Sequence, residues 1–302
     1  MKSIMTKVFE PKGSFDLIYQ NKFFNGWPML SDNRTIVMVF PIDGTDTSAA
    51  VTINQMTNGN LAINVISNSS NVAEEAVKQA LAALSLDEDG TGWQNIGEKD
   101  SVIRELQEKY NYIRPSLFNS PYEAAVHFII GHRISMVQGR KIRQNIAEEY
   151  GQEFVIEGTG YFAFPSPEKL LKVQNFPGIN STKMERLHSV ARAAIEGKLS
   201  REYLLSMEGS EALKYLESLP GIGPFFSQGI LSRGAGGADN MTHDDLTYHA
   251  ISVRYKLGDN PTEDQIFNIT DRWRPYRMWA IVLHHIWLRE SGNLPKRTFS
   301  KK

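Results

Sequence analysis

The chain of 302 residues contains no cysteine. Disulfide bonds, metal centres with cysteine ligands and catalysis by a thiol are therefore excluded. No stretch approaches the roughly 20 consecutive apolar residues of a membrane span, and the opening residues lack the apolar run of a signal peptide. These absences predict a cytoplasmic protein with no membrane partner.

An excess of positive charge is also missing. The 33 lysine and arginine residues are matched by 34 aspartate and glutamate residues, and the formal net charge is −1. A protein that held nucleic acid by overall charge would be strongly basic, because its phosphate contacts come from Lys and Arg. Binding to DNA would therefore need a local basic patch or backbone N–H donors.

The spacing of apolar residues along the chain changes near residue 114. Before it, three β-branched runs (34–42, 49–56 and 60–68) precede a helical pattern at 71–86. After it, apolar residues recur at three- and four-residue spacing, and no convincing strand is visible. We predict an α+β fold, in which an N-terminal antiparallel sheet domain packs on an all-α core. The expected divisions are a sheet-plus-helix domain at 1–112, an all-α region at 113–295 and a basic tail at 296–302.

The segment SLPGIGPFFSQGI reads as a helix, a tight turn and a second helix. Pro220 sets the turn, and Gly221 and Gly223 can adopt positive φ at little cost. Pro224 suits the first position of the second helix. Two glycines without side chains would let a phosphate approach the backbone N–H groups of the helix start. The alternative is a plain structural corner, since a glycine ends about a third to a half of helices.

Several segments occur in a characteristic order between about residues 114 and 290: SPYEAAVHFIIGHRIS, FPGINSTKMERLHSVARAAIEGKL, LPGIGPFFSQGI, HDDL and RWRPYRMWAIVLHHIW. This series resembles the helix-hairpin-helix DNA glycosylases, and among them bacterial 3-methyladenine DNA glycosylase II. The resemblance implies two helical subdomains with the active-site cleft between them. It also implies a bacterial, nucleoid-associated base-excision-repair enzyme that acts as a monomer on double-stranded DNA. Such an enzyme flips out a damaged base, here an alkylated purine, and hydrolyses its N-glycosidic bond to leave an abasic site.

The segment THDDLTYHAISV offers two aspartates at the start of a predicted helix. Asp245 matches the catalytic aspartate of the family, and Asp244 is then the helix cap. A helix N-terminus favours the ionised carboxylate that this chemistry requires. The alternative is that both aspartates only cap the helix.

The resemblance also indicates a pocket for the base. Phe225 and Trp287 match two pocket positions of the family, and Phe226 and Tyr248 are weaker candidates for which core packing is an equal alternative. Bifunctional relatives carry a Schiff-base lysine at the position of Phe225, so a monofunctional enzyme is expected. Gly229 stands where the alkylation enzyme has a pocket tyrosine, which predicts a pocket that is either more open or shaped for another lesion.

Contacts to DNA are expected at two places. The GHRIS segment departs from the family at two positions. The family usually has Gln at the position of His132 and Leu or Gln at the position of Arg133. The second of these side chains is the wedge that fills the hole left by the flipped base. The residues expected to bind DNA are His132, Arg133, Gly221, Ile222, Gly223 and Pro224. The segment RWRPYR (272–277) is a further candidate for phosphate contacts.

No cofactor is expected to be required. The resemblance implies a structural monovalent cation, Na⁺ or K⁺, on the main-chain carbonyls of Glu217, Leu219 and Ile222. Two other interpretations of the sequence stay open. One is a helix-hairpin-helix glycosylase for an oxidised or deaminated base, and the other is a non-catalytic DNA-binding protein that uses the same hairpin.

Overall fold

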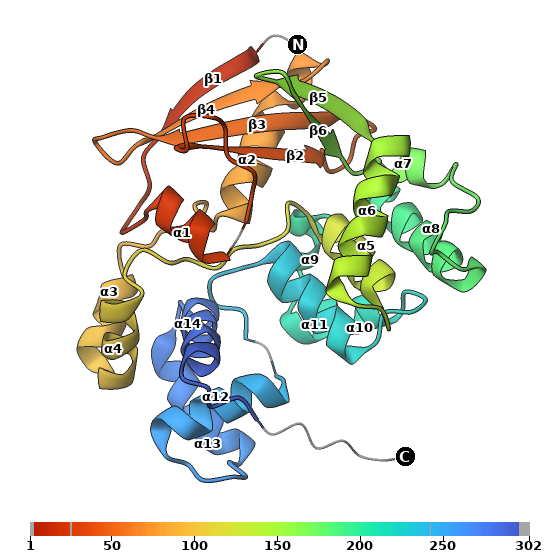
Figure 1. Cartoon of the computed structure of the whole chain (residues 1–302). Helices are drawn as coiled ribbons and strands as arrows, with labels where there is room; N and C mark the ends of the chain where they lie inside the picture. Colours follow the sequence, from red (N-terminus) through yellow and green to blue (C-terminus); the bar gives the residue numbers. More distant parts are fainter. Residues whose placement is uncertain (1–2, 25, 242, 296–302) are drawn as a thin grey trace.

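The computed structural model describes residues 3–24, 26–241 and 243–295, so the predicted basic tail at 296–302 lies outside the described residues. A four-stranded antiparallel sheet forms one end of the molecule (Figure 1), and its strand order is β1-β4-β3-β2. The strands are β1 (Ser3–Phe9), β2 (Thr35–Pro41), β3 (Ser48–Gln55) and β4 (Leu61–Ile66). The three predicted runs are thus all strands, and β1 is an additional edge strand.

The two faces of this sheet are covered by different elements. Along β2, Ile36, Met38 and Phe40 are buried in the cluster that includes α2 (Ala73–Ala83), which follows the short turn η1 (Ser70–Val72). Helix α1 (Leu17–Phe24) contributes Leu17 to the same cluster. Because strand side chains alternate, Val37 points to the opposite face. The predicted sheet with a helix on one face is confirmed.

The prediction that no strand follows residue 114, and that the region 113–295 is all-α, is wrong. Strands β5 (Gln152–Ile156) and β6 (Thr159–Ala163) form an antiparallel hairpin. Glu157 and Gly158 form its two-residue turn, with φ of 49° and 78°. Phe154 is fully buried in a cluster with Val37 and Ala50 on the second face of the main sheet. Packing on a distant sheet stabilises these short strands, and five-residue patterns between helices do not reveal such packing.

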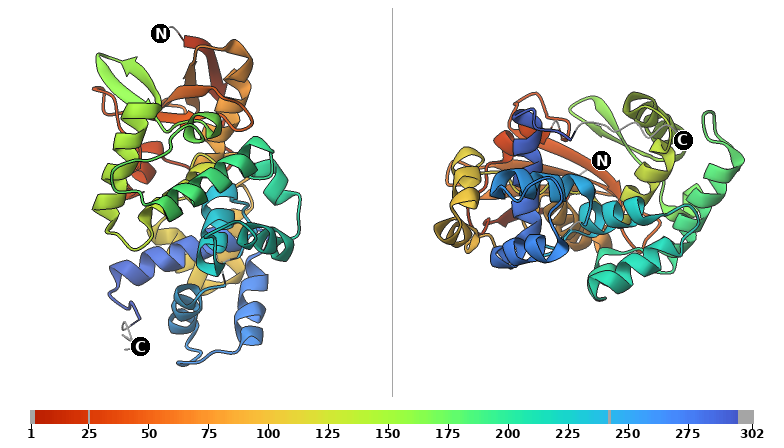
Figure 2. Two further views of the ribbon diagram at one scale, coloured as in Figure 1. Left: turned by 90° about the vertical axis from the view of Figure 1, so that its right-hand side faces the viewer. Right: turned by 90° about the horizontal axis from the view of Figure 1, so that it is seen from below.

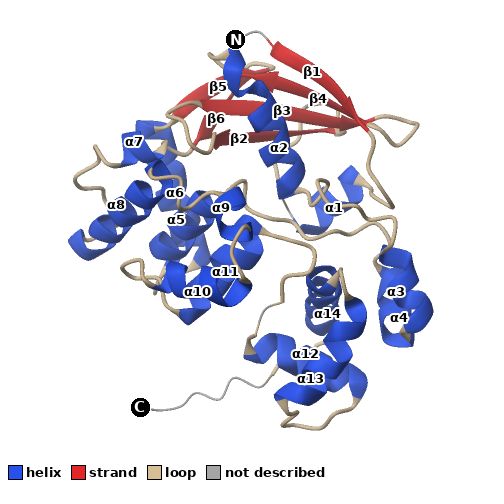
Figure 3. Cartoon of the chain, turned by 180° about the vertical axis from the view of Figure 1, so that it is seen from behind, coloured by secondary structure: helices blue, strands red, loops and turns tan. Residues whose placement is uncertain are grey.

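The helices form two groups, each with its own core (Figures 1 and 3). The first group follows the sheet domain and contains α5 (Pro121–Gly131), α6 (Met136–Tyr150), α7 (Pro167–Leu170), α8 (Ser181–Ile195), α9 (Arg201–Leu205), α10 (Gly209–Glu217), α11 (Pro224–Ile230) and the π-helical turn η2 (Leu231–Ala235). The second group contains α3 (Trp93–Lys99), α4 (Ser101–Lys109), α12 (Asp245–Tyr255), α13 (Glu263–Thr270), η3 (Asp271–Trp273) and α14 (Arg277–Glu290).

The second group joins segments that lie far apart in the sequence. Ile103 and Leu106 of α4 are buried in one cluster with Ile281 and Leu283 of α14. The view from below in Figure 2 shows α3 and α4 beside these C-terminal helices. The sequence alone grouped α3 and α4 with the sheet, whereas their apolar side chains are buried against α12–α14. No helix in the described part of the chain combines the length and hydropathy that a membrane span requires.

Arg114 lies where the sheet domain meets the helices. Its side chain is buried, and its guanidinium group stands 4.9 Å from the centroid of the Trp279 ring. The same group donates hydrogen bonds to backbone carbonyls that come from two segments of the first domain: Lys12, Ser14, Ser85 and Glu88. One side chain therefore bonds both segments and packs on a ring of α14.

We expect Arg114→Met to lower the free energy of unfolding by about 3 kcal/mol or more, because several carbonyls lose their donor together. Urea denaturation followed by circular dichroism measures this loss. Arg192→Met, on the exposed face of α8, is the matched control and should change stability by less than about 0.5 kcal/mol. Equal effects of the two substitutions would contradict a structural role for Arg114.

Candidate active site

The turn between α10 and α11 has the predicted form with one difference. Gly221 adopts a left-handed conformation with φ of 84°, whereas Gly223 is extended with φ of −103°. Pro224 is the first residue of α11, as predicted, and Ile222 is buried beneath the turn. No atom lies within 4 Å of the position that a Cβ on Gly223 would take. The outer side of the turn is therefore bare backbone open to solvent.

A cavity of about 1050 Å³ opens beside this turn, and we call it the hairpin cavity. It lies between the turn and the loop that joins α5 to α6. The residues predicted to bind DNA all line it, together with two predicted aromatic residues: His132, Arg133, Gly221, Ile222, Gly223, Pro224, Phe225 and Phe226. The structure thus brings together two segments that are about 90 residues apart in the sequence.

The loop that carries Arg133 is held in an unusual conformation. Arg133 has a φ of 58°, which costs a residue with a side chain roughly 1–2 kcal/mol. The Nζ atom of Lys183 donates hydrogen bonds to the carbonyls of Ile130, at 2.8 Å, and His132, at 2.9 Å. These bonds satisfy carbonyls at the end of α5 and hold the loop in place, so Arg133 is presented from a fixed backbone.

Phenylalanine rings fill one wall of the hairpin cavity. Phe225 is 74% exposed, and Phe226 stacks on Phe128 with a centroid distance of 5.3 Å and an interplanar angle of 30°. A Cβ on Gly229 would lie only 2.4 Å from Cζ of Phe128. The space that the glycine leaves is therefore filled by Phe128, and the expected opening of the pocket at Gly229 does not exist.

Asp245 is the first residue of α12, and its side chain is exposed. Asp244 precedes it as the N-cap and accepts a 2.8 Å hydrogen bond from the N–H of Thr247, so the predicted cap is confirmed. Among the described residues, the Asp245 carboxylate has no hydrogen-bond or ion-pair partner. It therefore stands at the positive end of a helix dipole with its oxygens available to a ligand.

Two of the predicted pocket residues lie in the other helical group. Tyr248 and Trp287 pack against the core of the second group and are not among the residues that line the hairpin cavity. The guanidinium group of Arg254 covers the Trp287 ring at 4.8 Å, and the Tyr248 hydroxyl lies 3.1 Å from Nδ1 of His243. The predicted aromatic residues therefore form two separate sets, one in each group.

A side chain on α11 connects the hairpin to the loop before Asp245. The Nε2 group of Gln228 donates to the carbonyl of His243 at 3.2 Å, and the N–H of His243 donates to Oε1 of Gln228 at 3.0 Å. Gln228 lies four residues after Pro224, and His243 lies two residues before Asp245. The paired bonds thus hold the loop before Asp245 against α11, although Asp245 itself is not among the residues that line the hairpin cavity.

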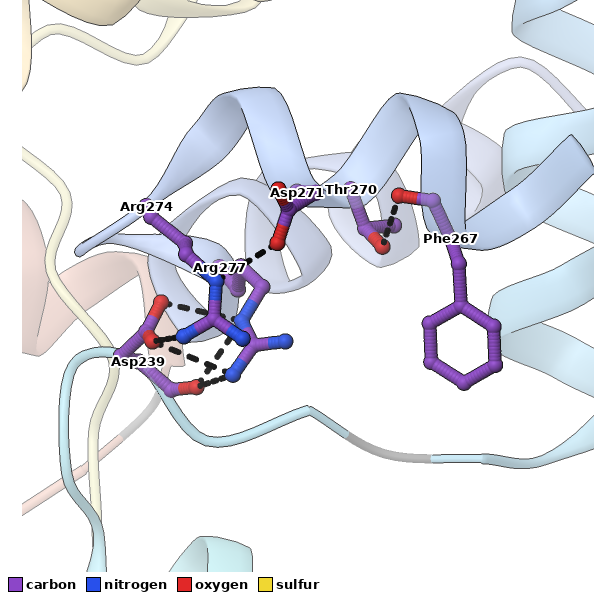
Figure 4. Close-up of polar contacts among 6 residues, drawn as sticks. All are labelled: Asp239, Phe267, Thr270, Asp271, Arg274 and Arg277. Atoms are coloured by element: carbon purple, nitrogen blue, oxygen red, sulfur yellow. Dashed lines mark hydrogen bonds and ion pairs between the residues drawn. The ribbon is translucent and has the colours of Figure 1, made fainter. Parts of the chain in front are cut away.

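An ion-pair cluster anchors the other end of this loop (Figure 4). Arg277 pairs with Asp239 at 2.9 Å, and Arg274 contacts both Asp239 and Asp271. The remaining arginine of the RWRPYR segment, Arg272, lies 3.8 Å from Asp100. A carboxylate thus lies beside each arginine proposed for phosphate contacts, and Arg274 and Arg277 are tied to the loop between η2 and α12.

Sequence reasoning missed a cluster of arginines beside the hairpin cavity. Arg140, Arg143 and Arg233 surround His127, and burial together with their charges lowers the pKa of this histidine to about 4. Arg186 also lines the hairpin cavity. The segment GRKIRQ (139–144) could have indicated this cluster, because it is a basic part of α6 that follows the loop carrying Arg133. The local basic patch that a chain with net charge −1 would need is therefore present.

The predicted cation site stays a prediction. The carbonyl of Leu219 accepts a 3.0 Å hydrogen bond from the N–H of Ile222, which leaves one of its two lone pairs for another ligand. In the described ranges, no group of three or more His, Asp or Glu side chains is placed to hold a metal ion.

The fold is that of the helix-hairpin-helix DNA glycosylases. It combines a sheet domain with two helical groups, has a Pro-Gly hairpin in the first group, and has an aspartate as the first residue of α12 in the second. A 3-methyladenine DNA-glycosylase from Archaeoglobus fulgidus has this fold, with a TM-score of 0.71 and 22% identity over 98% of this chain and 100% of that one. An 8-oxoguanine glycosylase/lyase from Clostridium acetobutylicum, solved with double-stranded DNA, gives a TM-score of 0.68 and 17% identity over 97% and 100% of the two chains.

The sequence comparisons point to the same class. The chain is 26% identical over 212 residues to the DNA-3-methyladenine glycosylase of Bacillus subtilis. The aligned residues cover 68% of this chain and 70% of that protein. It is 29% identical over 173 residues to DNA-3-methyladenine glycosylase 2 of Escherichia coli, covering 56% and 57%. No family model matches the chain. The predicted resemblance to the helix-hairpin-helix DNA glycosylases, and to 3-methyladenine DNA glycosylase II in particular, is confirmed.

Proposed function

We propose that this protein is a monofunctional DNA glycosylase of base excision repair that releases alkylated purines by hydrolysis of the N-glycosidic bond. One observation carries the proposal: Gln228, on the helix that begins at the hairpin turn, bonds the backbone of His243, two residues before the exposed carboxylate of Asp245. The names of the sequence relatives support an alkylated purine as the substrate.

The hairpin cavity offers a grip on one DNA strand. The bare turn at Gly221–Gly223 can approach a phosphate closely, and Arg133 and Arg186 add positive charge beside it. Such contacts position the duplex without reading its sequence. Arg133 then stands where a side chain must fill the hole left by the flipped nucleotide, and its planar guanidinium can stack on neighbouring bases.

Asp245 supplies the chemistry. Departure of the base leaves positive charge on the sugar, and an ionised carboxylate beneath it stabilises that charge or positions the attacking water. The benzyl side chain of Phe225 cannot form a Schiff base, so the strand stays intact at the abasic site. Phe225 and Trp287 would stack on the base, and a contact between a ring and a cationic base contributes about 0.5–2 kcal/mol. Because these two rings lie in different helical groups, the base would be held between the groups.

The enzyme is proposed to act as a monomer, since one hairpin grips one strand. A monovalent cation on the carbonyls of Glu217, Leu219 and Ile222 would tighten the turn, and no other cofactor takes part in the proposed reaction.

A panel of duplexes tests the proposed function. Each contains one 3-methyladenine, 7-methylguanine, hypoxanthine, ethenoadenine or 8-oxoguanine, and the released free base and strand nicking are scored separately. We expect release of an alkylated purine without nicking. Nicking at the rate of base release would contradict a monofunctional enzyme, and release of no base from any duplex would contradict a glycosylase.

The tether between the hairpin and the carboxylate gives a further prediction. Gln228→Ala removes both bonds to His243, and a misplacement of about 1 Å at a reacting group can cost roughly 10²-fold in rate. We expect the single-turnover rate of base release to fall at least tenfold while the Kd for duplex DNA stays within about twofold. Gln174→Ala, which removes an exposed amide in the loop between α7 and α8, is the control. An unchanged rate in Gln228→Ala would show that the tether does not position Asp245.

A further inference from the structure

The loop 132–135 between α5 and α6, which we call the wedge loop, is weakly tied to the helix before it. Two backbone hydrogen bonds connect it to α5, and they run from the N–H groups of His132 and Ile134 at 3.4 and 3.3 Å. Both are long, since backbone hydrogen bonds usually measure about 2.9–3.0 Å. The wedge loop nevertheless holds Arg133 at a φ of 58°. A contact from another part of the fold is therefore needed to hold this conformation.

Lys183 provides this contact from α8. Its Nζ atom donates to the carbonyls of Ile130, at 2.8 Å, and His132, at 2.9 Å. The carbonyl of His132 and the N–H of Arg133 belong to one planar peptide group. Lys183 thus fixes the plane on one side of the torsion φ of Arg133. In the part of the chain that the structure describes, the ammonium group forms no ion pair with a carboxylate, so its hydrogen bonds are directed to the wedge loop.

The Pro-Gly turn in FPGINSTK, just before α8, brings Lys183 to this place. Gly178 has a φ of 85°, and a Cβ there would lie only 2.8 Å from Cδ1 of Ile142, so the turn packs closely on α6. Asn180 then caps α8 and accepts a 2.8 Å hydrogen bond from the N–H of Lys183. The backbone of Lys183 is thus fixed against the helix that follows the wedge loop.

The side chain of Arg133 has room on both sides of the wedge loop. It lines the hairpin cavity, and it also lines a second hollow of about 720 Å³ beside the start of α8. Among the described residues, its guanidinium group has no hydrogen-bond or ion-pair partner. Because no contact of the side chain directs it, the direction in which Arg133 points depends on its backbone.

We propose that Lys183 is a positioning residue for base flipping, and that it sets the backbone of Arg133 so that the guanidinium group enters the base stack as the damaged nucleotide leaves. This inference rests on the proposed glycosylase function. Extrusion of a nucleotide breaks stacking and pairing, and a side chain that takes its place offsets part of that cost. Without Lys183 the wedge loop adopts other conformations, Arg133 enters the stack less often, and flipping slows.

A double-mutant cycle tests whether Lys183 acts through Arg133. Release of 7-methylguanine opposite cytosine is measured in single turnover, with the enzyme well above its Kd so that weaker binding does not lower the rate. Lys183→Met should lower the rate about tenfold or more, the value of a lost hydrogen bond to a charged group. In the Arg133→Ala background the same substitution should lower it less than about twofold. Lys183→Arg keeps the donors and should recover part of the rate.

A damaged base without a partner gives an independent measurement. With an abasic-site analogue opposite 7-methylguanine there is no base pair to break, so Lys183→Met should lower the rate less than about twofold. Lys172→Met, which changes an exposed lysine in the loop between α7 and α8, is the matched control and should alter neither rate. Lys183→Gln, which keeps one N–H donor group, replaces Lys183→Met if thermal melting shows that the latter does not fold.

The outcomes separate this inference from the function on which it rests. Equal losses in the two backgrounds, or from the two duplexes, would assign Lys183 to folding or DNA binding and overturn the inference. An unchanged rate in Lys183→Met would overturn it as well. In these cases the glycosylase proposal stands, because the wild-type protein still releases the base. A wild-type protein that releases no 7-methylguanine from either duplex would overturn both.

Discussion

Asp245→Asn is expected to lower the rate of base release by at least about 10²-fold while the affinity for duplex DNA stays nearly unchanged. The substitution keeps the size and shape of the side chain and removes its negative charge. The positive charge that develops on the sugar then loses its stabilising partner, whereas the phosphate contacts on the hairpin are untouched. Release of free base under single-turnover conditions and the Kd measured by fluorescence anisotropy give the two quantities.

The neighbouring aspartate offers a matched control for this experiment. Asp244 caps α12 through the N–H of Thr247, and asparagine is an equally good N-cap. Asp244→Asn should therefore keep both the helix and most of the activity. If Asp245→Asn excises bases at the normal rate, Asp245 is not the catalytic carboxylate, and a non-catalytic DNA-binding protein becomes the better interpretation.

Gly221→Asp is expected to weaken duplex binding by about tenfold or more, equally for damaged and undamaged DNA. Gly221 has a φ of 84°, and a Cβ there would lie 2.3 Å from Cδ of Arg186. The new side chain thus displaces an arginine of the hairpin cavity and places a carboxylate where a phosphate should bind. Because phosphate contacts carry no sequence information, the loss should not depend on sequence.

Backbone strain has to be separated from the loss of the phosphate site. Gly197 also has a positive φ, of 72°, and no atom lies within 4 Å of its Cβ position. Gly197→Asp introduces the same strain of roughly 1–2 kcal/mol and the same charge away from the hairpin. Gly197→Asp should lose thermal stability through backbone strain alone, and only Gly221→Asp should lose affinity. If its Kd is unchanged, the hairpin is only a structural corner.

The candidate site could be predicted from the sequence in its local parts. The hairpin turn, Pro224 at the start of α11 and Asp244 as a cap were each indicated by neighbouring residues, because turn and cap preferences act over a few positions. The pocket could not be predicted in the same way. Nothing near Gly229 in the sequence shows that Phe128, about 100 residues earlier, fills the space beside it.

The charged residues likewise divide into features that the sequence could predict and features that it could not. The composition indicated that any DNA contact needs a local basic patch or backbone N–H donors, and the structure gathers Arg140, Arg143 and Arg233 near His127. It also shows that Arg274 and Arg277, which the sequence offered as candidates for phosphate contacts, are paired with Asp239. Formal charge can be counted from a sequence, but whether an arginine is free or paired depends on what the fold puts opposite it.

By itself the amino-acid sequence determined the α+β class, the order of the main elements, the glycine turn and the caps, since periodicity and backbone preferences are properties of short segments. Only the tertiary structure decided that β5 and β6 form a hairpin on the first sheet, that α3 and α4 join α12–α14, and that Gln228 ties the loop before Asp245 to α11. These features depend on contacts between residues far apart in the chain, whose free energy appears only when the segments pack together.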